Sequence, residues 1–243
     1  MSDKLVLITG GDRGIGKATA YEFARAGFGL IITYFENETG AQETRQKCLQ
    51  LGARKVSIFQ LDLSSNESIE RVVSQVLRET ETIDVLINNA GVVLNKPVHE
   101  LTYSEIDWQF GVNLAGSIKL TAKILPGIRR AVVNIGSTLG LRGKRGLSVY
   151  SASKFGLRGF TQALAQERKD LLVFAIHPGL TNTRMGNLEG MAPERVARVI
   201  YQAVCGKFRR VSGSDIKVKF YAQGLAGRIL YLMQEFAKKV LGR

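Results

Sequence analysis

Short apolar runs alternate with longer amphipathic stretches through most of the chain. The apolar runs carry no regular polar position, which is typical of parallel strands that helices cover on both faces. They predict strands at residues 5–9, 30–33, 56–61, 83–88, 131–135 and 172–176. The amphipathic stretches predict helices at residues 14–26, 39–51, 65–80 and 148–168. We therefore expect an α/β fold with a doubly wound parallel sheet, the Rossmann arrangement.

The length and composition suit a single domain. The chain has 243 residues, of which 45% are hydrophobic, and no repeat or linker divides it. We expect one nucleotide-binding domain over 1–243, with its core at about 4–205 and a divergent basic segment at about 207–243. The apolar run near the N-terminus is too short for a signal peptide and leads into a glycine-rich turn, so we expect a cytoplasmic location. Two distant cysteines and two histidines give no metal spacing, and we expect no metal site.

The last stretch has the pattern of a basic amphipathic helix. Its apolar residues recur at helical spacing: Leu225, Ile229, Leu232, Met233, Phe236 and Val240. Three interpretations stay open. The helix packs on the domain or on a partner subunit, it docks peripherally on an anionic membrane surface, or it covers the substrate.

The charge of the chain lies in its second half. The formal net charge is +13. The region 108–166 has nine basic and no acidic side chains, and 207–243 has nine basic and two acidic ones. Such a field attracts a phosphorylated cofactor, a nucleic acid or an acidic membrane. We find no groove-reading motif or alternation of aromatic and basic residues, so we expect no nucleic acid as the main partner.

A glycine-rich turn joins the first predicted strand to the first predicted helix. Its sequence is Thr9-Gly10-Gly11-Asp12-Arg13-Gly14-Ile15-Gly16. Glycines let the main chain turn tightly and approach a pyrophosphate, while the helix N-terminus supplies N–H donors. The strand before it and the helix after it are the context that a dinucleotide site requires, so this turn predicts a cofactor site.

Tyr150 and Lys154 are four residues apart in the predicted helix 148–168, so their side chains share one face. An ammonium near a phenol stabilises the phenolate and lowers the tyrosine pKa, which suits a proton donor or acceptor near neutral pH. This spacing is common in helices, and the motifs that precede it give it meaning.

The order of the motifs resembles the short-chain dehydrogenase/reductase family of the classical type. The resemblance covers residues 4–205. The matching pieces are the glycine-rich turn, Asp62-Leu63, Asn88-Asn89-Ala90-Gly91, Asn113, Ser137, the Tyr150–Lys154 pair and Pro178-Gly179-Leu180-Thr181-Asn182-Thr183.

The resemblance implies a role for each catalytic position. Tyr150 is the general acid in reduction and the base in oxidation. Lys154 lowers the pKa of Tyr150 and holds the nicotinamide ribose. Ser137 polarises the substrate carbonyl, and Asn113, expected in a helix, organises a water of the proton relay. The cofactor carries the difficult chemical step and the protein provides placement.

The resemblance also implies the residues that contact the cofactor. Besides Tyr150 and Lys154, they are Gly10, Asp12, Arg13, Gly14, Ile15, Gly16, Tyr34, Asp62, Leu63, Asn89, Ala90, Gly91, Pro178, Gly179, Thr181 and Thr183. Tyr34 stands where an acid would select NAD, and Arg13 resembles the basic position of NADP-preferring members. Asp12 and Glu36 favour NAD instead, since a carboxylate repels a 2′-phosphate. We favour NADP(H) over NAD(H).

The substrate is expected to be a hydrophobic carbonyl compound or the matching alcohol. By analogy with the family, Leu139, Leu141, Leu147 and Met185 would form apolar walls. The substrate-covering loop, 184–193, is short, so we expect an open pocket.

The C-terminal part departs from the family. Residues 210–218 lack the usual Asp-Gly-Gly motif, so the tetramer of the family lacks its usual tail contact. A homodimer through the helices around Asn113 and Tyr150 is expected. Two other functions are a cofactor-binding regulator without catalysis and a nucleic-acid binder. The presence of both Tyr150 and Lys154 disfavours the first.

Overall fold

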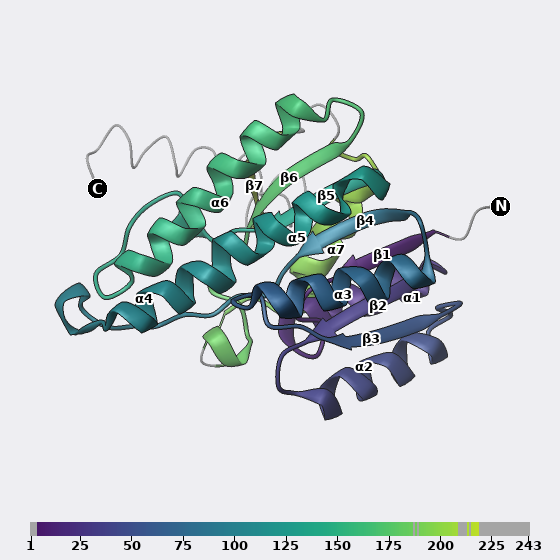
Figure 1. Ribbon diagram of the computed structural model, residues 1–243, viewed down its shortest axis with the longest axis horizontal. Helices are drawn as coiled ribbons and strands as arrows, with labels where there is room; N and C mark the ends of the chain where they lie inside the picture. Colours follow the sequence, from purple (N-terminus) through teal and green to yellow (C-terminus); the bar gives the residue numbers. More distant parts are fainter. Residues whose placement is uncertain (1–3, 187, 189, 209–212, 214, 219–243) are drawn as a thin grey trace.

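The protein forms a seven-stranded parallel sheet in the order β3-β2-β1-β4-β5-β6-β7 (Figure 1). The computed structural model describes residues 4–186, 188, 190–208, 213 and 215–218. The strands are β1 Leu5–Ile8, β2 Gly29–Tyr34, β3 Val56–Gln60, β4 Ile83–Asn88, β5 Ile128–Ile135, β6 Leu172–His177 and β7 Asp215–Lys217. The strand order reverses direction between β1 and β4, which is the point where α/β sheets of this kind bind ligands.

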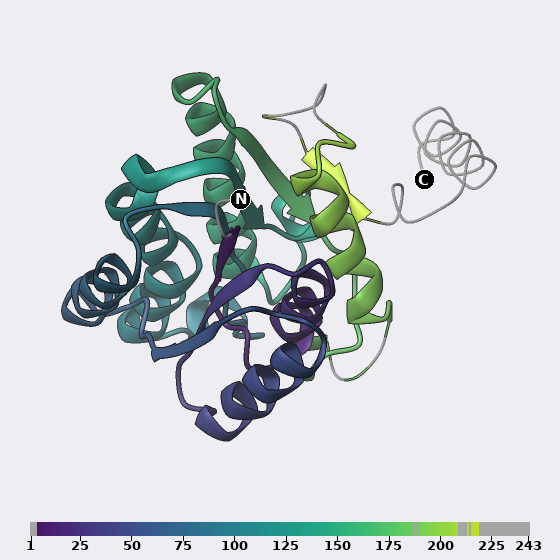
Figure 2. The ribbon, with the colours of Figure 1, turned by 90° about the vertical axis from the view of Figure 1, so that its right-hand side faces the viewer.

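Helices cover both faces of the sheet. Figure 2 shows the sheet between these two layers of helices. One layer contains α1 Gly14–Arg25, α2 Glu38–Gln50 and α7 Pro193–Val204. The other contains α3 Asn66–Glu79, α4 Tyr103–Phe110, α5 Gly116–Ile124 and α6 Ser148–Glu167. Among the described helices, none combines the length and the apolar character that crossing a membrane would need.

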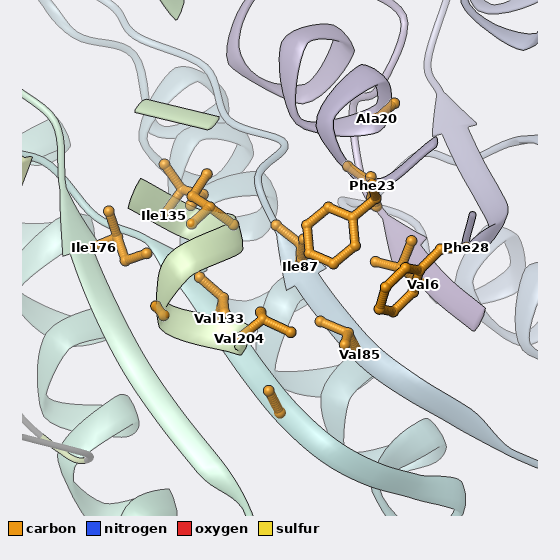
Figure 3. Packing of buried hydrophobic residues seen from close by; sticks show 14 of the residues in the cluster. Val6, Ala20, Phe23, Phe28, Val85, Ile87, Val133, Ile135, Ile176 and Val204 are labelled. Atoms are coloured by element: carbon orange, nitrogen blue, oxygen red, sulfur yellow. The ribbon is translucent and has the colours of Figure 1, made fainter. Parts of the chain in front are cut away.

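The core consists of two apolar clusters, one on each face of the sheet. Val6 points into the first cluster and its neighbour Leu7 into the second, because successive strand residues face opposite sides. In the first cluster, the Phe23 ring of α1 meets Phe28 edge-on, with 5.0 Å between ring centroids (Figure 3). Since both faces are buried, the central strands must be apolar at nearly every position, which explains the unbroken apolar runs in the sequence.

Buried polar side chains join the carboxyl ends of β4 and β5 to the helices above them. Asn88 donates to Asn134 on the neighbouring strand at 2.8 Å and to Thr121 of α5 at 2.9 Å. Asn134 donates to Thr161 of α6 at 2.9 Å. All four residues are buried. Buried amides need such partners, so these bonds fix α5 and α6 relative to the strand ends that carry the site.

The strands and helices that the apolar pattern predicts are present, and the Rossmann-type fold is confirmed. β5 begins at Ile128 rather than at residue 131, and α7 and β7 were not predicted. The helices expected around Asn113, whose bounds were not predicted, are α4 and α5. The expected basic helix at 225–240 lies outside the described residues.

Candidate active site

The candidate site is a cleft of about 570 Å³ at the carboxyl ends of the strands. The predicted residues that line it are Gly10, Asp12, Arg13, Gly14, Ile15, Tyr34, Asp62, Leu63, Asn89, Ala90, Gly91, Ser137, Tyr150, Lys154, Pro178, Gly179, Thr181 and Thr183. Two predicted residues, Gly16 and Asn113, are not part of its lining. The sequence motifs, far apart in the chain, therefore meet in one place.

The glycine-rich turn is shaped so that a dinucleotide can approach its main chain. Gly10 and Gly14 have φ angles of 63° and 54°, in the left-handed region that favours glycine. A Cβ atom on Gly16 would lie only 2.0 Å from the Gly10 carbonyl oxygen. The side chain of Asn89 donates to the carbonyl oxygens of Thr9 and Gly10, both at 2.9 Å, which ties the turn to the end of β4.

The N-terminus of α1 faces this turn without a side-chain cap. Arg13 is its N-cap residue, and the Arg13 side chain makes no capping hydrogen bond. The first N–H groups of a helix need acceptors and carry a partial positive charge, so a cofactor phosphate suits this position. The turn and the helix end together fit a nicotinamide dinucleotide.

The end of the cleft next to β2 combines one cation with aromatic side chains. Arg13 lines the cleft with 53% of its side chain exposed, and its Nε lies 3.4 Å from Asp12 Oδ2. The Asp12 carboxylate is nearly buried and accepts a hydrogen bond from Asn37 Nδ2 at 3.1 Å. Tyr34 also lines the cleft, whereas Glu36 does not. Of the two carboxylates that favour NAD, that of Asp12 lines the cleft and is paired with both Asn37 and Arg13, and that of Glu36 does not line it.

Tyr150 and Lys154 lie on the buried face of α6, at the wall of the cleft. Burial raises the pKa of Tyr150, and a hydrogen bond with the Ser137 side chain lowers it in part. Lys154 Nζ lies 5.9 Å from the centre of the Tyr150 ring and donates to the Ile135 carbonyl at 2.8 Å. Burial lowers the pKa of Lys154 to about 8.

The electrostatics of the pair differ from the expectation. A lysine that depresses the tyrosine pKa was predicted, but in this structure burial raises the pKa of Tyr150 and Ser137 is the group that lowers it. The physical reason is that Lys154 is itself buried and directed to a main-chain carbonyl.

Asn113 lies in a single π-helical turn, Gly111–Ala115, between α4 and α5. Its amide nitrogen donates to the Val92 carbonyl at 2.8 Å and to Ser153 Oγ at 3.2 Å, and its oxygen accepts from the Val92 N–H at 2.8 Å. The side chain therefore connects the loop after β4 to α6, where Ser153 precedes Lys154. The helical spacing in the sequence does not reveal the wide turn.

Ser137 follows β5, and its main chain is held from the neighbouring strand β6. The Ser137 carbonyl lies 2.8 Å from Nδ1 of His177, the last residue of β6. Nε2 of the same ring lies 2.9 Å from Asp215 of β7, and Asp215 also accepts from Arg158 of α6 at 2.7 Å. The sequence carries no local signal for His177, because its partners Ser137 and Asp215 lie 40 and 38 positions away in the chain.

The lining of the cleft also combines apolar side chains with exposed cations. The expected wall residues Leu139, Leu147 and Met185 line the cleft, whereas Leu141 does not. Leu180, Trp108, Val92 and Val93 add to the apolar lining. Three exposed cations, which we call the rim cations, also line the cleft: Arg142, Lys144 and Arg184. Arg142 and Lys144 are exposed and make no ion pair within the part of the chain that the structure describes.

Among the described residues, no group of three or more His, Cys, Asp or Glu side chains is arranged to hold a metal ion. Cys48 is buried and Cys205 exposed, and neither forms a disulfide.

The chain is similar to proteins of known family. A family model described as short chain dehydrogenase matches residues 4–192. The acetoacetyl-CoA reductase of Shinella zoogloeoides is 32% identical over 234 residues, which cover 93% of each chain. The 3-oxoacyl-(acyl-carrier-protein) reductase of Chlamydia trachomatis is 37% identical over 191 residues, covering 75% of this chain and 76% of the relative.

Solved structures agree with the sequence similarity. A short-chain dehydrogenase from Burkholderia cenocepacia in complex with NADP has a TM-score of 0.83 at 28% identity, covering 88% of this chain and 95% of that one. The acetoin dehydrogenase of Salmonella typhimurium has a TM-score of 0.82 at 25% identity, covering 89% of this chain and 94% of that one.

Proposed function

This chain belongs to the short-chain dehydrogenase family, and we propose that it reduces a carbonyl compound with NADPH, using Tyr150 as the proton donor. The oxidoreductase class follows from the family. The observation that carries the proposal is that Ser137, Tyr150 and Lys154 line the same cleft as the glycine-rich turn.

When bound, the nicotinamide cofactor supplies the hydride. The residues of the chain handle the oxygen of the substrate. Ser137 donates a hydrogen bond to the carbonyl oxygen, which stabilises the negative charge that develops there. Tyr150 gives its proton to that oxygen. Because Ser137 has a single hydroxyl proton, it donates to the substrate oxygen before this transfer and to the Tyr150 phenolate after it. In the oxidation of an alcohol, the same groups work in reverse, with Tyr150 as the base.

Lys154 supports this proton transfer. A lysine with a pKa of about 8 holds or releases a proton near neutral pH, so it can resupply Tyr150. By the family resemblance it also holds the nicotinamide ribose. Asn113 keeps α6 and the loop after β4 together through Ser153 and Val92, which maintains the spacing of the reacting groups.

The cofactor preference is proposed to be NADP(H). The glycine-rich turn and the N-terminus of α1 would hold the pyrophosphate, and Arg13 would meet the 2′-phosphate. Two observations support this choice: the Asp12 carboxylate is engaged by Asn37, and Glu36 does not line the cleft.

The cofactor experiment compares kcat/KM for NADPH and NADH in the wild type and in Arg13→Ala. We expect the wild type to prefer NADPH and the variant to lose at least tenfold in kcat/KM for NADPH but little for NADH, since only NADPH carries the phosphate. A wild-type preference for NADH would refute the assignment.

The substrate is proposed to have a carbonyl near an apolar body and an anionic far end. The apolar lining from Leu139, Leu147 and Met185 suits the body, and the rim cations Arg142 and Lys144 suit the anion. Two relatives are named as reductases of acetoacetyl-CoA and of 3-oxoacyl carrier protein, both of which are 3-oxoacyl thioesters. We propose this substrate class.

The substrate experiment follows NADPH absorbance with ketones, aldehydes, quinones and oxoacyl thioesters. We expect acetoacetyl-CoA to be reduced with a kcat/KM at least tenfold above that of ethyl acetoacetate, and the ratio to fall in Arg142→Gln/Lys144→Gln. An equal kcat/KM for acetoacetyl-CoA and ethyl acetoacetate would refute the role of Arg142 and Lys144.

The role of Tyr150 is tested by Tyr150→Phe, with Tyr103→Phe as a matched control. Tyr103 is 87% exposed on α4 and lies outside the cleft. We expect Tyr150→Phe to lose at least a hundredfold in kcat and the control to lose nothing, because only the first variant lacks the proton donor. Unchanged turnover in Tyr150→Phe would refute Tyr150 as the proton donor, whereas a wild type that reduces no compound of the panel would favour a cofactor-binding regulator.

The assembly is proposed to be a homodimer through α4, α5 and α6. Phe155, 41% exposed on α6, and Tyr103 on α4 give these helices exposed aromatic side chains. Light scattering after size exclusion should give twice the monomer mass, and a tetramer would contradict the proposal.

The cytoplasmic location and the membrane contact of the segment 207–243 stay predictions.

A further inference from the structure

His177 is the least exposed titratable group near the candidate site. Its side chain has 0% exposure at the end of β6. The ring packs directly against the main chain before Ser137, since a Cβ atom on Gly136 would lie 2.7 Å from His177 Nδ1. The ring therefore occupies a fixed position behind the catalytic serine.

The hydrogen-bond partners of the ring determine how many protons it carries. Nδ1 faces the Ser137 carbonyl oxygen at 2.8 Å, and Nε2 faces Asp215 Oδ1 at 2.9 Å. A carbonyl oxygen and an ionised carboxylate are both acceptors only, whereas a neutral imidazole has one donor and one acceptor. Both contacts are satisfied together only if both ring nitrogens carry a proton.

The partner carboxylate is itself held in its ionised form. Arg158 Nε donates to the second oxygen of Asp215 at 2.7 Å, and an arginine side chain stays charged in proteins. The chain of contacts thus runs from Arg158 on α6 through Asp215 on β7 and His177 on β6 to Ser137 after β5. It connects the helix of Tyr150 to the main chain of the serine.

We propose that His177 is a positioning residue that holds both ring protons and, through Nδ1–H, fixes the main chain of Ser137 for catalysis. Asp215 accepts from Nε2–H and orients the ring. The catalytic consequence rests on the proposed function of Ser137, whereas the protonation of the ring does not. A neutral histidine in a protein core would instead face one hydrogen-bond acceptor and one hydrogen-bond donor.

The first experiment measures the ring protons directly, without substrate or cofactor. The chain has only two histidines, and His99 is 79% exposed at its side chain, so nitrogen NMR of histidine-labelled protein gives two sets of signals. His99→Gln assigns them. At pH 7 we expect both nitrogens of His177 to be protonated; a ring with one unprotonated nitrogen would overturn the proposal.

A second variant checks the reason for the second proton. In Asp215→Asn, the amide can donate to Nε2, so the ring needs a proton only at Nδ1. We expect the Nε2–H signal to disappear while the Nδ1–H signal remains. Two protons retained in this variant would mean that the carboxylate is not their cause, and would overturn the assignment.

The kinetic experiment uses two substitutions that each keep one of the two contacts. The amide of His177→Asn can replace Nδ1–H toward Ser137, and the longer amide of His177→Gln can replace Nε2–H toward Asp215. We expect His177→Asn to keep kcat within about threefold of the wild type. We expect His177→Gln to lose about tenfold to a hundredfold in kcat with the KM for NADPH unchanged, because Ser137 is then displaced from its reacting position.

The outcomes separate the two proposals. If both variants unfold at the wild-type temperature and lose kcat equally, or lose none, the positioning role is wrong. If the wild type reduces no compound of the panel, the proposed function is wrong, and the nitrogen signals still decide whether the ring carries two protons.

Discussion

Replacing the buried lysine of the site should make the protein more stable while removing its activity. Lys154 is 4% exposed, and burial lowers its pKa from 10.5 to about 8. The folded protein thus disfavours the ammonium that the unfolded chain carries freely. Lys154→Met removes this buried charge and keeps an unbranched side chain of similar length.

The magnitude follows from the two pKa values. A gap of about 2.5 between the folded and unfolded states corresponds to about 3 kcal/mol against folding at neutral pH. The variant also loses the hydrogen bond from Nζ to the Ile135 carbonyl, which contributes about 1 kcal/mol. We therefore expect Lys154→Met to gain about 2 kcal/mol in the free energy of unfolding at pH 7, or about 4–8 °C in Tm.

The stability difference between Lys154→Met and the wild type should change with pH. Below pH 8, Lys154 is protonated in both states and the cost to the wild type is complete. Between pH 8 and about 10.5 the unfolded chain binds the proton that the folded protein does not, so the wild type gains stability relative to the variant as pH rises. Above this range only the lost hydrogen bond remains, and the variant should be the less stable protein.

The assay is urea unfolding of the cofactor-free protein, followed by the fluorescence of Trp108, the one tryptophan. The matched control is Lys119→Met, since exposed Lys119 also donates a hydrogen bond, to Asn66 at 2.8 Å, but carries no buried charge. The reasoning would be refuted if Lys154→Met were less stable than the wild type at pH 7. It would also be refuted if the stability difference between these two proteins stayed constant to pH 10.

Other predictions follow from the packing and the caps. Gly16→Ala should lose at least about 3 kcal/mol of stability and its NADPH binding in a fluorescence titration, because its Cβ would lie 2.0 Å from the Gly10 carbonyl oxygen. Exposed Cys205 should react quickly with a thiol reagent in the native protein, whereas Cys48, buried with its pKa raised to about 12, should react only on unfolding; fast reaction of both would contradict this. Thr102→Ala removes the capping box of α4 and should cost about 1 kcal/mol in urea unfolding with unchanged kcat.

The central strands could be predicted because both of their faces are buried. This requires apolar residues at consecutive positions, and such runs stand out in a sequence. The start of β5 was missed because Arg129 and Arg130 interrupt the run. Arg129 is exposed, and Arg130 Nε donates to the Val204 carbonyl at 2.9 Å. β7 was missed for a similar reason, since three residues at a sheet edge leave no apolar run.

The residues of the site could be predicted where one local motif carries the chemistry. The glycine-rich turn and the Tyr150–Lys154 pair are of this kind, and the structure brings them to one cleft. The pKa of Tyr150 could not be predicted from spacing, because it depends on burial and on Ser137. His177 could not be found either, since its partner Asp215 lies 38 positions away in the chain.

The π-helical turn at Gly111–Ala115 makes chain length a constraint on this segment, beside the residue type of Asn113. It holds one residue more than an α-helical turn, and each residue rotates a helix by about 100°. A single deletion here would rotate all of α5, turning Leu120 and Ile124 away from the sheet. Natural variants of this protein should therefore keep the number of these residues, and Asn113 among them, even where the other residue types change.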